Sequence, residues 1–194
     1  MNLRRHTVKA IQKIGWIYVS DLFFVTPSDR LADVQTNKQC ELLAITSENA
    51  VRSCEFREED LTAEFRAKLE KGEAGFFAVV EGQAAGNIWA TVNRSPKPAT
   101  VRGFMRLMPK EALIHDIVTG TNFRGLGIGP YMVTQIVPIL FGHESVQRIV
   151  IDVNVKNTPS LKMMRKAGLR AKEKAVAVSL FQNLIYRKTL ENYV

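Results

Sequence analysis

Apolar and polar positions along the chain follow two spacings, one typical of strands and one typical of helices. Short apolar or alternating runs predict strands at 16–25, 41–46, 76–80, 84–92, 112–119, 148–153, 174–180 and 183–189. Apolar residues three or four positions apart predict helices within 47–71, from Pro130 onward and over 157–168. Strands and helices in this order predict an α/β fold.

Turn-forming residues mark where several of these elements begin and end. Gly82 lies between two strand patterns and predicts a hairpin. Asn157 can cap a helix whose first turn contains Pro159, and Gly168 can end that helix in a left-handed conformation. Pro138 predicts a kink or an early end in the helix that starts near Pro130.

A glycine-rich segment, 124–129 with the sequence Arg-Gly-Leu-Gly-Ile-Gly, joins the strand 112–119 to the next helix. Glycine lets backbone N–H groups approach a ligand closely, and a helix N-terminus favours negative charge, so diphosphate suits this geometry. The glycine spacing does not fit a dinucleotide-binding turn, and Pro130-Tyr131 replaces the Lys-Ser/Thr pair of a P-loop. The alternative is a turn that only solves a packing problem.

The composition is that of an ordinary globular protein. The chain has 194 residues, 46% hydrophobic and 24% charged, which is enough for one well-cored domain. No stretch approaches the roughly 20 apolar residues of a membrane helix, and no cleavage site follows the run 14–25. Cys40 and Cys54 form neither a metal-ligand spacing nor a disulfide framework, so we expect a cytoplasmic protein.

The net charge of +8 is concentrated in two regions. One region is residues 1–14, where the sequence predicts a short basic amphipathic helix. Such a helix can associate weakly with an anionic membrane surface or pack on the edge of the domain, and we favour packing. The second comprises Lys162, Arg165, Lys166, Arg170, Lys172 and Lys174. Positive charge attracts anionic ligands in general, although a solvated face explains most of these side chains.

Two motifs together resemble the GCN5-related N-acetyltransferase (GNAT) superfamily. The segment 124–129 matches its R-x-x-G-x-G pattern, and Asn157-x-x-Ser160 followed by 166–169 is similar to its N-x-x-S…K-x-G-F segment. The order of predicted elements over about 41–190 is also similar. The resemblance implies a mixed, mostly antiparallel α/β sheet, flanked by helices and splayed at its central strands. Residues 1–40 would be an N-terminal extension packed on a domain of residues 41–194.

The resemblance also implies acetyl-CoA as co-substrate and no metal. Backbone groups of Ile117, Val118 and Thr119 would hold the pantetheine arm and the acyl carbonyl. The pyrophosphate would lie on the turn, and Asn157 and Ser160 would line the thiol end of the channel. The turn residues concerned are Arg124, Gly125, Leu126, Gly127, Ile128 and Gly129. Lys162, Arg165 or Lys166 would meet the outer phosphates.

Acyl transfer to an amine requires a group that accepts the amine's proton. Glu111 lies thirteen residues before Arg124, close to the spacing of the catalytic glutamate in histone-type members of the family. Alternation puts His115 on the same face as Glu111 and Asp116 on the opposite face. Each of these three residues is a candidate for catalysis, and a structural polar residue is the alternative for each. Met164 stands where many members carry a tyrosine that protonates the leaving thiol.

The sequence therefore predicts an acetyl-CoA-dependent N-acetyltransferase that acts on a primary amine of a small molecule, with an amino sugar as one candidate. A catalytically silent acyl-CoA-binding sensor is the alternative, which the missing tyrosine favours slightly. Only charge supports an RNA-associated protein, so no nucleic-acid partner is expected. Dimers are common in the family, which makes a homodimer a further expectation. Candidate acceptor contacts are Trp89, Arg102, Phe104, Arg106 and Tyr186.

Overall fold

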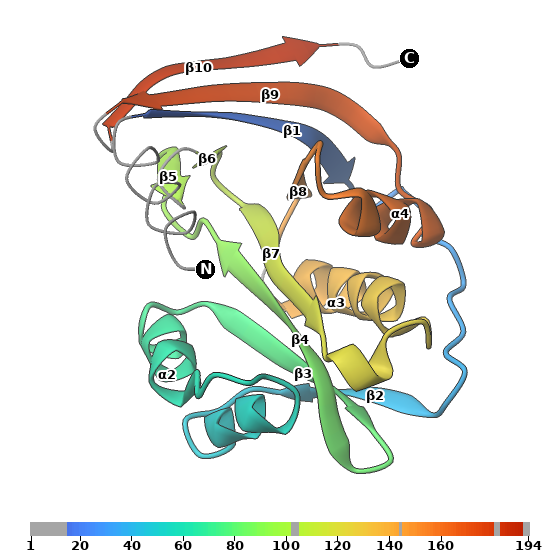
Figure 1. The fold of residues 1–194 in the computed structure, drawn as a ribbon. Coiled ribbons are helices and arrows are strands. Elements are labelled where there is room, and N and C mark those ends of the chain that lie inside the picture. The colour runs from blue at the N-terminus through green and yellow to red at the C-terminus, as the bar shows by residue number, and fades with distance from the viewer. Residues whose placement is uncertain (1–14, 102–104, 144, 181–182, 192–194) are drawn as a thin grey trace, which may run out of the picture.

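The computed structural model describes residues 15–101, 105–143, 145–180 and 183–191. Its main feature is an eight-stranded sheet. The strands of this sheet are β1 (Gly15–Val25), β2 (Cys40–Ala44), β3 (Ala74–Val80), β4 (Gln83–Val92), β7 (Glu111–Thr119), β8 (Arg148–Asn154), β9 (Ala171–Leu180) and β10 (Asn183–Glu191). They lie in the order β10-β9-β1-β8-β7-β4-β3-β2 (Figure 1). Every neighbouring pair is antiparallel except β7 and β8, which confirms a mixed, mostly antiparallel sheet.

Helices cover both faces of the sheet. The helical segments are η1 (Ala50–Glu55), α2 (Thr62–Glu70), η2 (Thr121–Phe123), α3 (Ile128–His143) and α4 (Thr158–Lys166). Along β3, Ala78 and Val80 share a core with α3 and α4, while Phe77 and Val79 pack with Phe65 of α2. Alternation along the strand therefore separates the two helical layers. No helix in the described ranges is long and apolar enough to cross a membrane.

Two local predictions need correction, and one small sheet was not predicted. The predicted helix within 47–71 is two shorter segments, η1 and α2. Helix α3 does not end at Pro138 but continues to His143, and Pro138 is exposed at the surface. A small two-stranded sheet, β5 (Ala99–Val101) with β6 (Met105–Leu107), was not predicted, because each strand is too short to show alternation.

The strand predicted at 16–25 is β1, and it lies inside the main sheet. Ser20 to Val25 pair with Asn154 to Ile149 of β8, and the other edge of β1 pairs with β9. The first strand along the chain is thus held between two of the last strands. The basic helix predicted at 1–14 lies outside the described residues.

Candidate functional site

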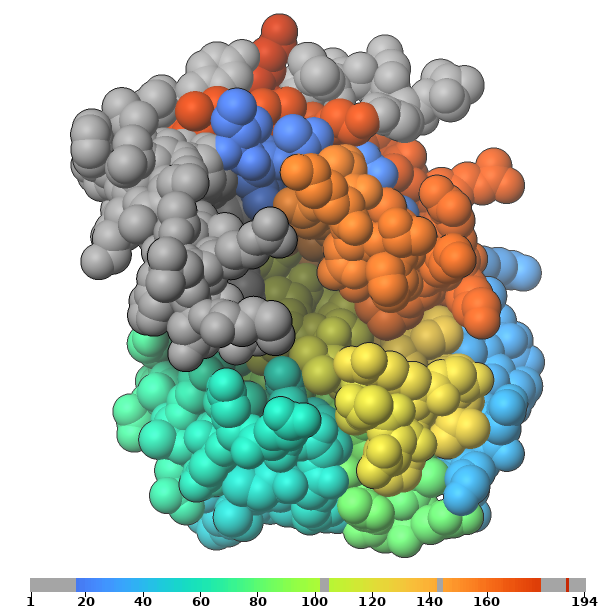
Figure 2. Space-filling model, viewed as in Figure 1, coloured from blue at the N-terminus to red at the C-terminus, as the bar shows by residue number. Residues whose placement is uncertain are grey.

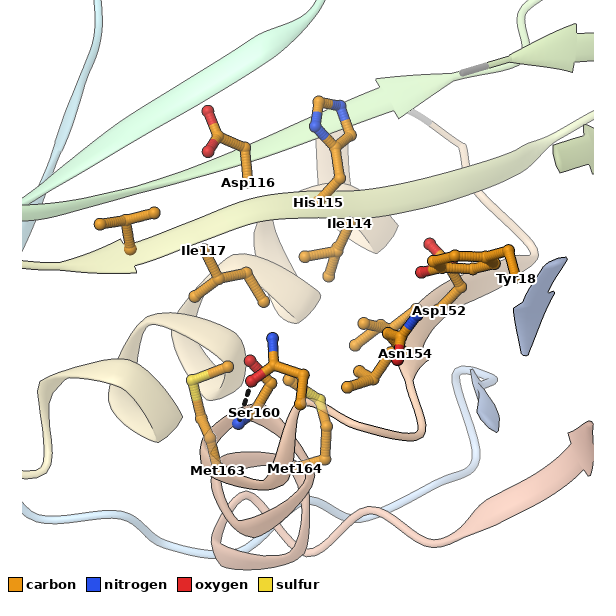
Figure 3. Close-up of a pocket in the computed structure, with 14 residues that line it drawn as sticks. Tyr18, Ile114, His115, Asp116, Ile117, Asp152, Asn154, Ser160, Met163 and Met164 are labelled. Carbon is orange, nitrogen blue, oxygen red and sulfur yellow. Dashed lines mark hydrogen bonds between the residues drawn. The ribbon is translucent and has the colours of Figure 1, made fainter. Parts of the chain in front are cut away.

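The parallel strands β7 and β8 separate before either one ends. Their pairing runs from Glu111 with Arg148 to Ile114 with Ile151 and stops there. Beyond that point a cavity of about 250 Å³ opens between them (Figure 3). Residues from β1, β7, β8 and the α4 region line it: Tyr18, Ile114, His115, Asp116, Ile117, Val118, Ile151, Asp152, Val153, Asn154, Asn157, Ser160, Met163 and Met164.

A bulge in β7 shapes one wall of this cavity. The register with β4 shifts so that Val118 pairs with Asn87 while His115 pairs with Trp89, and Asp116 has a φ of 46°. The extra residue changes the alternation, as bulges do. His115 and Asp116 therefore project to the same side of β7, opposite Ile114 and Ile117 (Figure 3). The prediction that Asp116 points away from His115 is wrong for this reason.

Asp116 is held in an ion-pair network on the α2 side of the sheet. Its Oδ2 lies 2.7 Å from Nζ of Lys68, and its Oδ1 lies 3.4 Å from Nη2 of Arg57. Burial raises the pKa of the Asp116 carboxyl, but the hydrogen bond from Lys68 and the charges of Lys68 and Arg57 outweigh burial. The pKa is therefore lowered, and a carboxylate with a lowered pKa is a weak proton acceptor.

His115 is buried and lines the same cavity. Its Nε2 lies 2.9 Å from Oγ1 of Thr91 and 3.2 Å from Oε2 of Glu73. These two contacts fix the orientation of the imidazole ring.

Glu111 lies at the other end of β7 and does not line the cavity. Its Oε1 accepts from Nε of Arg148 at 2.6 Å, and its Oε2 accepts the backbone N–H of Met108 at 2.8 Å. Both carboxylate oxygens are thus engaged in structural contacts. The bulge at Asp116 and the early separation of the strands bring His115 and Asp116, and not Glu111, to the cavity.

The glycine turn has the conformation that its sequence predicts. Gly125 and Gly127 have φ values of 83° and 82°, and α3 follows directly. The segment 26–39 between β1 and β2, called the N-terminal loop here, supports the turn. Asn37 N–H donates to the carbonyl of Leu126, and a Cβ on Gly127 would lie 3.0 Å from the Gln35 carbonyl oxygen. At Gly125 a Cβ would meet nothing within 4 Å, so this part of the backbone faces open space.

A second cavity of about 320 Å³ lies next to the turn. Val118, Thr119 and Arg124 line it on one side, and the segment 56–59 with Leu61 lines the other. Figure 2 shows this face hollowed between the yellow segment after β7, the teal η1–α2 region and the orange α4. Val118 lines both cavities, whereas Ile117 lines only the first, and Thr119 and Arg124 line only the second.

Helix α4 closes the first cavity from the opposite face of the sheet. Asn157 caps the helix, with its Oδ1 accepting the Ser160 N–H at 3.2 Å, and both residues line the cavity. Met164 also lines it and is fully buried in the core. Tyr131 does not replace the missing tyrosine, because its hydroxyl donates to the carbonyl of Cys40 at 2.7 Å.

Sequence reasoning missed Tyr18 and Asp152 at the cavity. The Tyr18 hydroxyl donates to Oδ2 of Asp152 at 3.0 Å. The sequence does contain a signal for Asp152, because a carboxylate within an otherwise apolar strand is costly to bury unless it has a partner. Nothing local indicated Tyr18, since its place depends on β1 pairing with distant strands.

The predicted acceptor contacts are only partly described. Trp89 is buried in the core against Phe65, and Arg106 is exposed on β6. Arg102, Phe104 and the side chain of Tyr186 lie outside the described part of the chain. Among the described residues no group of three His, Cys, Asp or Glu side chains could hold a metal ion.

Solved structures with similar folds include acetyltransferases. An acetyltransferase of the GNAT family from Colwellia psychrerythraea matches with a TM-score of 0.60 and 13% identity, covering 91% of this chain and 60% of that one. A GCN5-related N-acetyltransferase from Kribbella flavida matches with a TM-score of 0.56 and 14% identity, covering 91% of this chain and 62% of that one. This chain therefore spans less than two thirds of the length of either protein.

A third solved structure is matched over almost its whole length. The aminoglycoside acetyltransferase AAC(6')-Ib, solved in complex with coenzyme A, matches with a TM-score of 0.56 and 15% identity, covering 79% of this chain and 95% of that one. At such identities these likenesses concern the fold. No curated protein matches the sequence. The family model for the acetyltransferase (GNAT) family matches residues 41–169, more than half of the sequence, and the chain therefore belongs to that family.

Proposed function

We propose that the protein is an N-acetyltransferase that moves an acetyl group from acetyl-CoA to a primary amine of a small molecule, by direct transfer in a ternary complex. The observation that carries the proposal is the cavity between β7 and β8, which has His115 on one wall and Asn157 and Ser160 on another. Family membership supports an acyltransferase, and the coenzyme A complex of AAC(6')-Ib supports the choice of donor.

The residues of the turn fit a coenzyme that carries phosphates. Gly125 is left-handed and faces open space, which leaves the backbone accessible, and α3 begins directly after the turn. The N–H groups of 125–129 would bind the pyrophosphate, and the exposed Arg124 would add a charge-assisted contact. The backbone of Ile117 to Thr119 would hold the pantetheine arm. The bound coenzyme supplies an activated thioester.

His115 is the residue that we assign to proton removal from the acceptor amine. It lines the cavity and contacts the carboxylate of Glu73, which stabilises an imidazolium once the ring has taken a proton. Asp116 is already paired with Lys68 and Arg57, and Glu111 is paired with Arg148 outside the cavity. Each of those two carboxylates would have to give up a cation before it could accept a proton.

Met164 favours a second candidate, a silent acyl-CoA-binding sensor. Its buried thioether cannot donate a proton to a leaving thiolate. A thiol with a pKa of about 8.5 can leave without that help, so the absence of the tyrosine is compatible with turnover. Measurement of turnover separates the two candidates.

The first test is calorimetric titration with acetyl-CoA, CoA and ATP, followed by thiol release in the presence of a panel of amines. We expect both coenzyme forms to bind and ATP to bind weakly or not at all. The variant Arg124→Gln should weaken coenzyme binding, whereas Lys71→Gln, which removes an exposed charge that lines neither cavity, should not. Coenzyme binding without turnover on any amine would favour the sensor. No binding would refute both candidates.

A further inference from the structure

Among the described residues, Asp152 differs from the other carboxylates around the divergent strands because it has no basic partner. Glu111 is paired with Arg148, and Asp116 with Lys68 and Arg57. Asp152 is half-buried and accepts a hydrogen bond from the neutral Tyr18 hydroxyl. Within the described part of the chain no Lys, Arg or His lies within ion-pair distance of it. Leaving a partly desolvated carboxylate without a cation is unfavourable, unless a ligand supplies the cation.

The Asp152–Tyr18 pair lies on the same face of the sheet as His115. Leu113, Val150 and Leu22 pack together in one core on that face. His115 and Asp152 follow Leu113 and Val150 by two residues, and Tyr18 precedes Leu22 by four, so alternation puts all three on that face. Figure 3 shows Tyr18 beside Asp152 on the β8 side of the cavity, while His115 comes from β7.

We propose that Asp152, oriented by the hydroxyl of Tyr18, binds a second ammonium group of the acceptor, one that does not react. The inference rests on the proposed function and assigns its acceptor class: a diamine or polyamine, including amino sugars with several amines. A carboxylate stabilises the protonated form of a bound amine and raises its pKa, which opposes nucleophilic attack. Asp152 therefore suits the amine that stays charged, and His115 the amine that must lose a proton.

Two further observations bear on a cationic acceptor. The chain carries a net charge of +8, which repels cations at long range, so a specific local carboxylate is needed to hold one. Among proteins of similar fold, AAC(6')-Iy was solved with the bisubstrate analogue CoA-S-monomethyl-acetylneamine and an aminoglycoside acetyltransferase was solved with sisomicin. These likenesses concern the fold, and Asp152 and Tyr18 carry the proposal for this chain.

The test compares cadaverine with its monoamine counterpart pentylamine as acceptors, together with neamine. We expect the wild-type protein to prefer cadaverine and neamine over pentylamine. Asp152→Asn keeps the shape of the side chain and can still accept the Tyr18 hydrogen bond, but it removes the charge. It should raise the KM for cadaverine about 10- to 100-fold, since a hydrogen bond to a charged group has that effect, and so remove the preference for cadaverine over pentylamine.

Tyr18→Phe removes the hydroxyl that orients Asp152 and should raise the KM for cadaverine by a smaller factor. Glu81→Gln is the matched control, because it removes an exposed carboxylate at the β3–β4 hairpin, away from both cavities. Equal efficiency with cadaverine and pentylamine would overturn the inference. So would a preference for cadaverine that survives in Asp152→Asn.

A separate readout keeps the inference testable if no amine is acetylated. Cadaverine is titrated calorimetrically into the protein saturated with CoA, at two salt concentrations. Binding that weakens with salt and is lost in Asp152→Asn would support the site even though the proposed activity had failed. No cadaverine binding to the CoA-loaded protein, or the same binding in Asp152→Asn, would overturn it.

Discussion

At the scale of single residues, the carboxyl groups near β7 differ in chemistry because they differ in partners. Glu111 and Asp116 are neutralised by basic side chains, Glu73 contacts His115, and Asp152 accepts from Tyr18. The residue types alone could not distinguish these roles. Their assignment depends on contacts between residues that are far apart in the sequence.

We expect His115→Gln to lower kcat about 100- to 10,000-fold, the usual contribution of a general base, with coenzyme affinity unchanged. Thiol release and calorimetry measure the two quantities. Glu111→Gln is the comparison, because it breaks the ion pair with Arg148 and keeps an acceptor for the Met108 N–H. It should lower stability by about 1 kcal/mol, since Arg148 is partly exposed, and change kcat by no more than a few-fold. A large loss of kcat in Glu111→Gln, together with a small loss in His115→Gln, would instead identify Glu111 as the base.

The lowered pKa of Asp116 predicts a contribution to stability that depends on pH. The group ionises more readily in the folded state, so its contribution is present above the unfolded pKa and is lost as the pH falls through the folded pKa. Asp116→Asn should therefore be less stable than the wild type at neutral pH. Denaturant unfolding at a series of pH values should show the difference shrinking below about pH 4. A difference that stays constant down to pH 2–3 would contradict the ion-pair account.

At the scale of the elements, glycines with the same backbone conformation serve different purposes. Gly168 ends α4 with a φ of 84°, and Gly82 turns the β3–β4 hairpin with a φ of 81°. A Cβ on Gly168 would lie 2.8 Å from the backbone N of Ala32, whereas a Cβ on Gly82 would meet nothing within 4 Å. Gly168 thus permits both the turn and a close contact with the N-terminal loop.

The two glycines form a matched pair for mutation. Gly82→Ala should cost about 1 kcal/mol for the left-handed backbone alone. Gly168→Ala should cost clearly more, because it adds a steric contact with backbone that cannot move cheaply. Denaturant midpoints of the two variants measure the difference. Equal losses would mean that the N-terminal loop yields easily at Ala32.

Local patterns predicted most of the elements but not the bulge in β7. The hairpin around Gly82, the glycine turn and the Asn157 cap depend on residues within a few positions of one another, and each was predicted from the sequence. The bulge at Asp116 depends on partners in β4, in the segment after η1 and in α2: Asn87, Arg57 and Lys68. No periodicity within β7 reports such partners, so the faces of His115 and Asp116 could not be predicted together.

At the scale of the whole molecule, β1 joins the first described residues to the last strands. It pairs with β8 on one side and with β9 on the other, and it brings Tyr18 to the cavity. The apolar run predicted a strand there, but its place in the sheet follows from pairings across most of the sequence. The assignment of Tyr18 therefore had to await the structure.

Because β1 lies between β8 and β9, we expect slow hydrogen exchange of its backbone amides. Both edges of the strand are paired from Ser20 to Phe23, so the amides of these residues should be protected about as strongly as those of β8. Exchange monitored by mass spectrometry of peptides from the two strands measures this. The edge strand β2 is the internal comparison, since it pairs on one side only within the main sheet. Exchange in β1 as fast as in β2 would contradict the pairing.

The same pairing has a consequence for the order in which the protein is made and folded. A ribosome produces β1 before every other strand of the sheet, but its two neighbours, β8 and β9, emerge among the last. Contacts between such distant segments form slowly, and domains fold as units during synthesis. The nascent chain must therefore carry an apolar, unpaired β1 until β8 and β9 have been synthesised, and the half of the sheet that holds Tyr18 and Asp152 can assemble only then.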